Sequence, residues 1–143
     1  MIPYSICIIT KNECHILEEC LRRLKPLGQE IVVLDTGSTD DTCDMVVKYT
    51  DKLFHFEWCN DFSAARNECI KHACNDYILT VDSDEYLTAW VEAKNQKLIN
   101  ANPKGIGRIY RTDTYTQQGE TRTVREGMGR FFSKKLYHYE GSI

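Results

Sequence analysis

The segment that decides the fold is residues 77–85, which have the sequence YILTVDSDE. Its apolar first half predicts a short β-strand, and two aspartates, Asp82 and Asp84, follow where that strand ends. Residues i and i+2 of a strand point the same way, so we expect both carboxylates to project together into a crevice. Carboxylates held side by side need a cation or a shared proton, and Mg²⁺ or Mn²⁺ prefers oxygen ligands. The segment therefore predicts a metal-dependent nucleotide or phosphate site, although Asp and Ser are also common turn residues.

Outward from this segment, apolar runs alternate with amphipathic segments. The predicted strands are residues 6–9, 31–34, 53–56 and 77–81, with a helix between each consecutive pair. The first helix is predicted to be capped by Asn12 and to end at Pro26 and Gly28, and the third to be capped by Asp61 or Ser63. Strand–helix alternation with short links predicts a parallel sheet.

The pattern changes after residue 87. A helix is predicted over residues 88–100, and strands over 106–115 and 121–125, joined by a hairpin at 117–120. One more strand pair is predicted over 130–132 and 136–139. The fold class is therefore α/β: a mostly parallel, Rossmann-like sheet flanked by helices, with a smaller antiparallel β part toward the C-terminus. We expect a single domain over residues 1–143, divided into a nucleotide-binding part at 1–87 and an acceptor-side part at 88–143.

Three predicted strand ends are polar: residues 10–13, 35–40 and 82–85. Ligands of open parallel sheets bind outside the carboxyl ends of the strands. We therefore expect these three segments to converge on one edge of the sheet.

The bulk composition excludes several classes of protein. The chain has 143 residues and a net charge of −3, so it lacks the basic footprint of a nucleic-acid-binding protein. No apolar run is long enough for a membrane span, and the N-terminus lacks the pattern of a signal peptide. Seven cysteines occur without any Cys-x-x-Cys pair. They are interpreted as reduced, mostly packing residues, which predicts a cytoplasmic protein.

Four segments in this order resemble the family 2 inverting glycosyltransferases of the GT-A fold. They are IITKNE at residues 8–13, VLDTGSTDDT at 33–42, FSAARN at 62–67 and VDSDE at 81–85. The resemblance is close over about residues 4–90 and looser beyond. It implies transfer of a sugar from a nucleoside-diphosphate sugar, with UDP as the default carrier, to an acceptor that is a saccharide, a lipid or a protein.

The resemblance also implies roles for particular residues. Asp35 would accept a hydrogen bond from the base, Arg66 would face the diphosphate, and Asp84 would be the direct metal ligand, with Asp82 as a second partner of the ribose or the metal. Mn²⁺ or Mg²⁺ is the implied cofactor. The implied nucleotide-sugar-binding residues are Thr10, Asn12, Glu13, Asp35, Gly37, Ser38, Arg66, Asp82 and Ser83. Taken singly, most of these are also ordinary cap, turn or surface residues.

The catalytic base is less well defined. Inversion requires a base that removes the acceptor proton, and Glu85 and Glu126 are the candidates, with Glu140 as a weaker one. Residues 130–143 resemble a segment that precedes a His-Glu pair in one branch of the family. We therefore expect the chain to be the N-terminal part of such a domain, without that pair.

Two other classes of function remain open on the sequence alone. One is a non-catalytic nucleotide-sugar-binding module, and the other is a phosphotransferase with Asp82 as its nucleophile. A Rossmann dehydrogenase is disfavoured because no Gly-x-Gly-x-x-Gly follows the first strand. Exposed β-edges would favour a homodimer.

Overall fold

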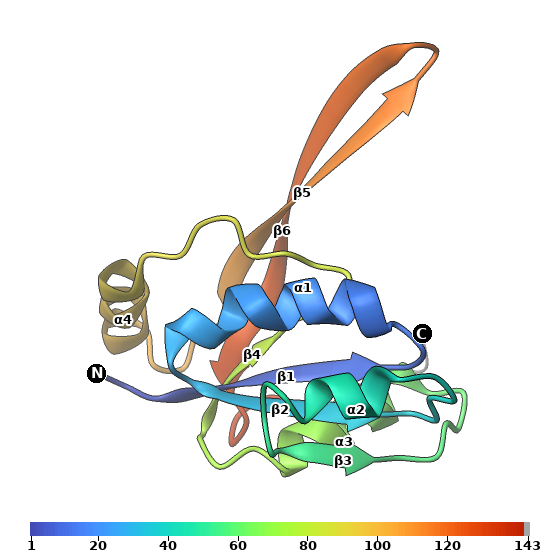
Figure 1. The fold of residues 1–143 in the computed structure, drawn as a ribbon. Coiled ribbons are helices and arrows are strands. Elements are labelled where there is room, and N and C mark those ends of the chain that lie inside the picture. Colours follow the sequence, from blue (N-terminus) through green and yellow to red (C-terminus); the bar gives the residue numbers. More distant parts are fainter. Residues whose placement is uncertain (142–143) are drawn as a thin grey trace.

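A single six-stranded sheet with helices on both faces organises the computed structural model, which describes residues 1–141 (Figure 1). Its strands are β1 (Tyr4–Thr10), β2 (Glu30–Asp35), β3 (Leu53–His55), β4 (Tyr77–Thr80), β5 (Gly107–Gln117) and β6 (Glu120–Ser133). Its helices are α1 (Cys14–Leu24), the 3₁₀ turn η1 (Lys25–Leu27), α2 (Thr42–Val46), α3 (Phe62–Lys71) and α4 (Glu92–Ala101).

The strand order is β3-β2-β1-β4-β6-β5. The first four strands are parallel, whereas β6 runs antiparallel to both β4 and β5. This arrangement confirms the predicted α/β class, including the smaller antiparallel part toward the C-terminus. The strand order reverses at β1, because β2 and β3 lie on one side of β1 and β4 lies on the other.

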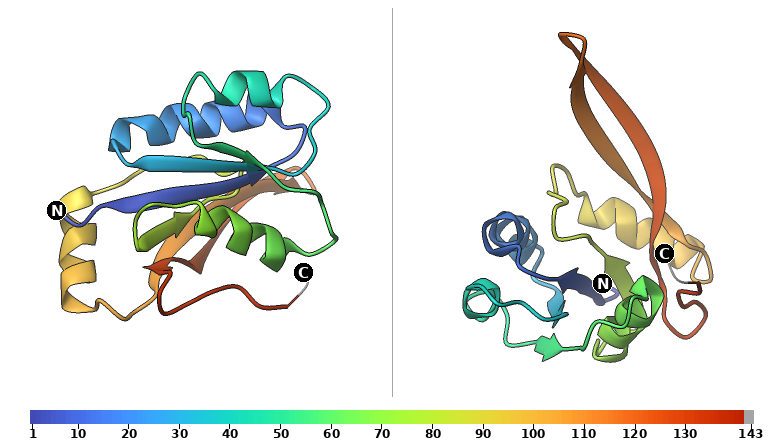
Figure 2. Two further views of the ribbon diagram at one scale, coloured as in Figure 1. Left: turned by 90° about the horizontal axis from the view of Figure 1, so that it is seen from below. Right: turned by 90° about the vertical axis from the view of Figure 1, so that its right-hand side faces the viewer.

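The parallel strands are buried on both faces, which explains their continuous apolar runs. Side chains alternate between two cores, so that Ile6 and Ile8 of β1 lie in one core and Cys7 lies in the other. The first core contains the apolar faces of α1 and α2, together with Ile99 of α4. The second contains Ala65, Cys69, Ile70 and Ala73 from α3 and the residues that follow it. The right-hand view of Figure 2 shows α1 and α2 on one side of the sheet and α3 on the other.

The helix ends agree with the sequence at two positions and differ at a third. Asp61 caps α3, because its carboxylate accepts from the Ala64 amide at 3.1 Å, and Gly28 ends η1 with a left-handed φ of 67°. The prediction that Asn12 caps the first helix is wrong. Asn12 has a φ of 51°, and its side-chain oxygen accepts instead from the amides of Thr39, at 2.7 Å, and Asp40. Its side chain therefore joins two loops.

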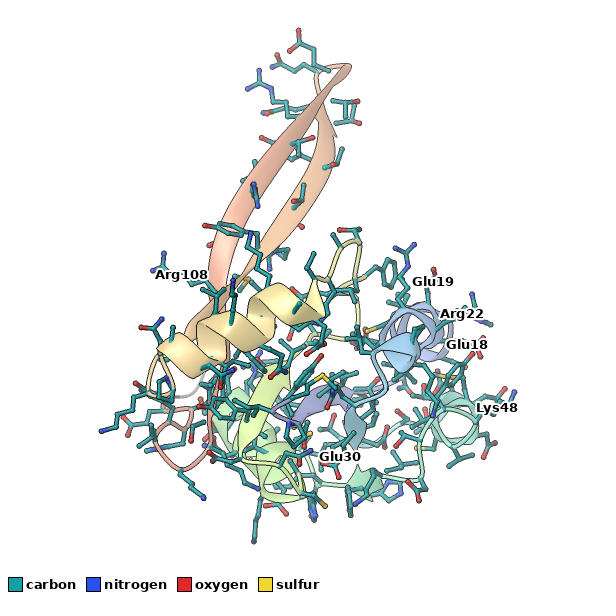
Figure 3. The ribbon with its side chains drawn as sticks, turned by 90° about the vertical axis from the view of Figure 1, so that its left-hand side faces the viewer. Glu18, Glu19, Arg22, Glu30, Lys48 and Arg108 are labelled. Carbon is teal, nitrogen blue, oxygen red and sulfur yellow. The ribbon has the colours of Figure 1, made fainter. Side chains whose placement is uncertain are left out.

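The strands β5 and β6 form a long hairpin that projects from the body of the molecule (Figures 1 and 2). Gln118 and Gly119 turn it with φ values of 52° and 79°, as a tight two-residue hairpin requires. Most of the side chains beyond its base are exposed, and Figure 3 shows them extending into solvent above Arg108. The outer face of α1 is also charged, with Arg22 pairing with Glu19 at 2.7 Å.

The prediction of a strand pair over 130–132 and 136–139 is wrong in its second half. Residues 130–132 are the end of β6, which pairs with β4, whereas residues 136–139 form a turn and an extended segment. The reason is that the Leu136 and Tyr137 amides donate to the Ser133 carbonyl, and the Tyr139 amide donates to the Asn67 side chain at 2.9 Å. Ser142 and Ile143, the end of the family-like segment, lie outside the described residues. Within residues 1–141, no helix is both long and apolar enough to cross a membrane.

Candidate functional site

A cleft of about 360 Å³ opens at the carboxyl ends of β1 and β4, where the strand order reverses. This is the position at which open α/β sheets bind their ligands. All four family-like segments contribute to its wall directly, through Thr10 and Glu13, Thr36, Arg66, and Asp82 and Asp84. The predicted convergence of polar strand ends is therefore present around this cleft, which we call the first cleft.

Thr10, one of the residues that line the first cleft, has a buried and unsatisfied side-chain hydroxyl. Thr10, the last residue of β1, is 2% exposed, and its Oγ1 has no hydrogen-bond partner among the described residues. A buried polar atom without a partner costs free energy unless a ligand or water supplies the bond. Close by, the Glu13 carboxylate accepts from the buried Ser83 hydroxyl at 2.7 Å, which ties the first segment to the Asp82–Asp84 turn.

One wall of the first cleft combines a cation with aromatic rings. The Arg66 guanidinium lies 3.7 Å from Asp82 Oδ1 and stacks over the rings of Phe62, at 5.6 Å, and Tyr139, at 5.3 Å. Trp58 packs edge-on against Phe62 and also lines the cleft. Arg66 is therefore held in place with its charge directed at the cleft, as a residue that binds an anion requires.

Asp35 lies behind the cleft rather than in its wall. It is 3% exposed, and its carboxylate accepts from the amides of Gly37, at 3.1 Å, and Ser38, at 2.9 Å, and from the Ser38 hydroxyl. Burial raises the pKa of Asp35, but these hydrogen bonds outweigh burial, so the pKa is lowered overall. Asp35 is consequently an ionised group that shapes the loop after β2, and its neighbour Thr36 is the residue that lines the cleft.

The Asp82–Glu85 turn is braced by Arg130, which the sequence interpretation did not identify as a site residue. The Arg130 guanidinium binds both oxygens of Glu85, at 3.0 and 3.1 Å, and Oδ2 of Asp82 at 3.3 Å. The Glu85 carboxylate also accepts from the Asp82 amide at 2.8 Å. The only sequence signal for this role was a lone arginine before the apolar pair Phe131 and Phe132 in a strand.

Carboxylates concentrate at this turn. Burial, and next the negative charges of Glu85, Asp84, Asp82 and Glu13, raise the pKa of the Cys20 thiol beneath the turn to about 12. Asp84 is exposed and makes no ion pair among the described residues, whereas Asp82 is paired with two arginines. Oxygen ligands in a negative field suit a hard divalent cation. Asp84 therefore offers exposed oxygens of the kind that a hard divalent cation takes.

A second cleft of about 490 Å³ lies on the other side of the same turn. Glu85 and Arg130 line it together with Tyr86, Trp90 and Tyr110. The two clefts share Thr80, Val81 and Asp84. Asp84 thus lies between two clefts, one beside the loops after β1 and β2 and one at the base of the β5–β6 hairpin.

Comparison with known proteins identifies the family. Residues 5–140 match the profile of Glycosyl transferase family 2. The chain belongs to this family. The four segments that carried the resemblance lie within the matched residues, and the cleft that they surround is at the strand ends where open α/β sheets bind ligands.

Individual relatives of this family 2 chain are much longer than it is. A TPR repeat-containing protein of Synechococcus elongatus is 43% identical over 98 residues, which cover 67% of the chain and 24% of the relative. The SPbeta prophage-derived glycosyltransferase SunS of Bacillus subtilis is 42% identical over 85 residues, which cover 57% and 20%. The chain thus spans about a fifth to a quarter of the length of these relatives.

Solved structures agree with the fold. The structure of TarS 1-349 from S. aureus in complex with UDP superposes with a TM-score of 0.62 at 25% identity, covering 79% of this chain and 34% of that one. This similarity confirms the GT-A fold of the family 2 chain.

The structure brings most of the predicted site residues of this family 2 protein together and leaves some apart. The wall of the first cleft includes Thr10, Glu13, Arg66, Asp82, Ser83 and Asp84. The loops behind that wall hold Asn12, after β1, and Asp35, Gly37 and Ser38, at the end of β2, and of these Asn12 and Gly37 are exposed. Glu85 lies in the second cleft, whereas Glu126 lies on the projecting hairpin, 60% exposed and 3.4 Å from Arg111.

Proposed function

We propose that the protein transfers a sugar from a nucleoside-diphosphate sugar, with UDP as the carrier, and that the first cleft is the donor site. The observation that carries this proposal is the meeting of all four family segments around the first cleft, where Arg66 is fixed in the wall beside Asp82. TarS, which shares the fold, has been solved with UDP and with UDP-GlcNAc. Membership of the family gives no support to the phosphotransferase alternative.

Within the donor site, each wall would bind a different part of the donor. The loops at Thr10–Glu13 and Asp35–Ser38 would hold the nucleoside, with their side-chain oxygens accepting from the base and ribose and their amides donating to them. Arg66 would face the diphosphate, because its guanidinium is fixed at the cleft wall by Asp82 and the aromatic rings. The leaving diphosphate would thus meet a positioned cation.

A divalent cation, Mn²⁺ or Mg²⁺, would complete the site at Asp84 with Asp82 beside it. When bound, such an ion neutralises the negative charge that develops on the departing diphosphate. Asp84 has exposed oxygens to offer, and Arg130 holds the turn that presents them through Asp82 and Glu85. The chain's own contribution is therefore a rigid, acidic turn between the two clefts.

The acceptor would enter the second cleft and attack with inversion. Glu85 is the candidate base there. Burial raises its pKa above the ordinary value for a glutamate, and the negative charges of Asp82 and Asp84 add to this effect, while the Asp82 amide and Arg130 oppose it. A carboxylate with a raised pKa is a better proton acceptor, as a general base needs. Seven free cysteines support a reducing, cytoplasmic site of action.

The first test is calorimetric titration of UDP into the protein with and without Mn²⁺. We expect Mn²⁺ to strengthen the binding of UDP. In the Asp84→Ala variant, we expect the affinity for UDP to fall to the level measured without metal. Asp113→Ala is the matched control, since Asp113 is an exposed acid on the hairpin, ion-paired with Arg111. Absence of UDP, GDP and dTDP binding under every metal condition would overturn the donor-site assignment.

A second measurement separates an enzyme from a binding module. Release of UDP from UDP-GlcNAc, followed with mixed saccharide, lipid and peptide acceptors, reports transfer. The same assay is then run on a longer chain that extends beyond residue 143. If that chain binds the nucleotide sugar with metal but transfers no sugar, the protein is a non-catalytic nucleotide-sugar-binding module.

A further inference from the structure

Three side chains with metal-ligand chemistry meet at the edge of the sheet behind the first cleft. Asp35 ends β2, His55 ends β3 beside it in parallel register, and Cys43 lies in the first turn of α2. One potential ligand atom from each lies within 4.8 Å of the other two, and His55 Nδ1 is 3.8 Å from Asp35 Oδ2. Among the residues that the structure describes, this is the one cluster of three such groups.

The cluster of Asp35, Cys43 and His55, which we call the triad, offers different ligand atoms from the acidic turn at Asp82–Glu85. A thiolate, an imidazole and a carboxylate together favour a borderline-soft cation, whereas oxygen-only donors favour Mg²⁺ or Mn²⁺. We propose that Asp35, Cys43 and His55 form a Zn²⁺ site separate from the Asp82–Asp84 turn. With three protein ligands, the fourth position of the ion is open to water or to a ligand atom.

The geometry requires only a small closure. In a tetrahedral zinc site, bond lengths of about 2.0–2.3 Å place the ligand atoms roughly 3.3–3.7 Å apart. The separation between His55 Nδ1 and Asp35 Oδ2 is already close to that range at 3.8 Å. The His55 side chain is 70% exposed, so it is free to reorient and remove the remaining distance. Bringing the ligand atoms together therefore requires His55 to move and leaves Asp35 in place.

The buried ligand is already oriented. The Gly37 and Ser38 amides and the Ser38 hydroxyl hold the Asp35 carboxylate, which fixes the direction of its oxygens as second partners of metal ligands commonly do. This carboxylate is 3% exposed, and its one ion-pair partner among residues 1–141 is His55. A divalent ion would add a direct bond to a carboxylate that these hydrogen bonds already keep ionised.

Binding has a defined proton balance. Burial raises the pKa of the Cys43 thiol, and the Asp35 charge raises it further, so the thiol enters the reaction with its proton. Zn²⁺ binds the thiolate and the neutral imidazole, and the thiol proton passes to solvent. No oxidant or reductant takes part.

Asp35 also belongs to a loop that would hold the nucleoside, so the test of the zinc site is kept apart from nucleotide binding. The described residues that line the first cleft include Thr36 but none of the three triad members. Zinc binding can therefore be measured with no nucleotide present, and its failure leaves the UDP titration untouched.

The test is competition for Zn²⁺ between the reduced, metal-free protein and a chromophoric chelator. Loss of an outer partner of a metal ligand costs about 10–100-fold in metal affinity, so we expect loss of a ligand itself, in Cys43→Ser or in His55→Ala, to weaken the tightest zinc site by at least about a hundredfold. The matched controls are Cys59→Ser, which removes an exposed thiol, and His15→Ala, which removes an exposed imidazole. Both controls should retain the affinity of the parent protein.

A second readout identifies the ligands directly. Co²⁺ substituted for Zn²⁺ should show a thiolate-to-metal charge-transfer band in the parent protein and in both controls, and Cys43→Ser should lose it while circular dichroism shows an unchanged fold. Equal loss of zinc affinity in Cys59→Ser and Cys43→Ser would mean adventitious binding by surface thiols. That result, or tight binding that survives both Cys43→Ser and His55→Ala, would overturn the proposal.

Discussion

Replacement of Arg130 by methionine tests how the acidic turn is held. Arg130 is 10% exposed at its side chain and makes a two-pronged ion pair with Glu85 and a single contact with Asp82. Methionine keeps much of the volume of arginine and removes the charge. The change therefore leaves Glu85, 20% exposed, and Asp82, 40% exposed, without their shared cation.

The expected loss of stability follows from these exposures. Breaking a fully buried ion pair costs about 3–5 kcal/mol, because the remaining charge has no partner. The Glu85 pair is mostly but not fully buried, so we assign it about 2 kcal/mol, and the more exposed Asp82 contact contributes less than about 1 kcal/mol. Arg130→Met should thus lower the free energy of unfolding by about 2–3 kcal/mol.

Urea denaturation monitored by tryptophan fluorescence measures this loss. The matched control is Arg122→Met on the same strand, where the arginine is 60% exposed and pairs with an exposed Glu120; it should change stability by less than about 0.5 kcal/mol. A double variant, Glu85→Gln with Arg130→Met, should recover part of the loss, since the uncompensated charge is removed. If Arg130→Met lowers the free energy of unfolding by less than about 1 kcal/mol, which is only twice the largest change expected for the control, the bracing role is refuted.

Three further predictions concern the fold and the loop after β2. Asp61→Ala should destabilise the protein by about 1 kcal/mol in urea denaturation, because the Ala64 amide loses its cap; an unchanged midpoint would contradict this. Gly28→Ala should cost about 1 kcal/mol through its left-handed φ alone, since no atom lies within 4 Å of an added Cβ, and Gly28→Asn should cost less. The lowered pKa of Asp35 gives stability that is present above the unfolded-state pKa, about 4, and is lost as the pH falls through the folded-state pKa. Urea denaturation of Asp35→Asn across this acidic range should show a weaker dependence on pH than the parent protein; an equal dependence would refute the assignment.

The sequence predicted the elements of the sheet because their signals are local. The apolar runs at 6–9 and 31–34 are strands buried on both faces, and the alternation with helices predicted the parallel sheet. The prediction failed at residues 136–139, where alternating apolar residues resembled a strand. There, the Leu136 and Tyr137 amides donate to the Ser133 carbonyl, and the Tyr139 amide donates to the Asn67 side chain. These hydrogen bonds outweighed the strand propensity. Propensity is a weak signal when distant side chains compete for the same backbone groups.

What the sequence by itself determined is the family, the α/β class and the polar strand ends of the first cleft, because each depends on residues that are neighbours in the chain. Only the tertiary structure decided which distant groups meet. Arg130 reaches Glu85 from 45 residues away, and Asp35, Cys43 and His55 converge from β2, α2 and β3. The physical reason is that strand order and register set these meetings, and both depend on packing across the whole sheet rather than on local periodicity.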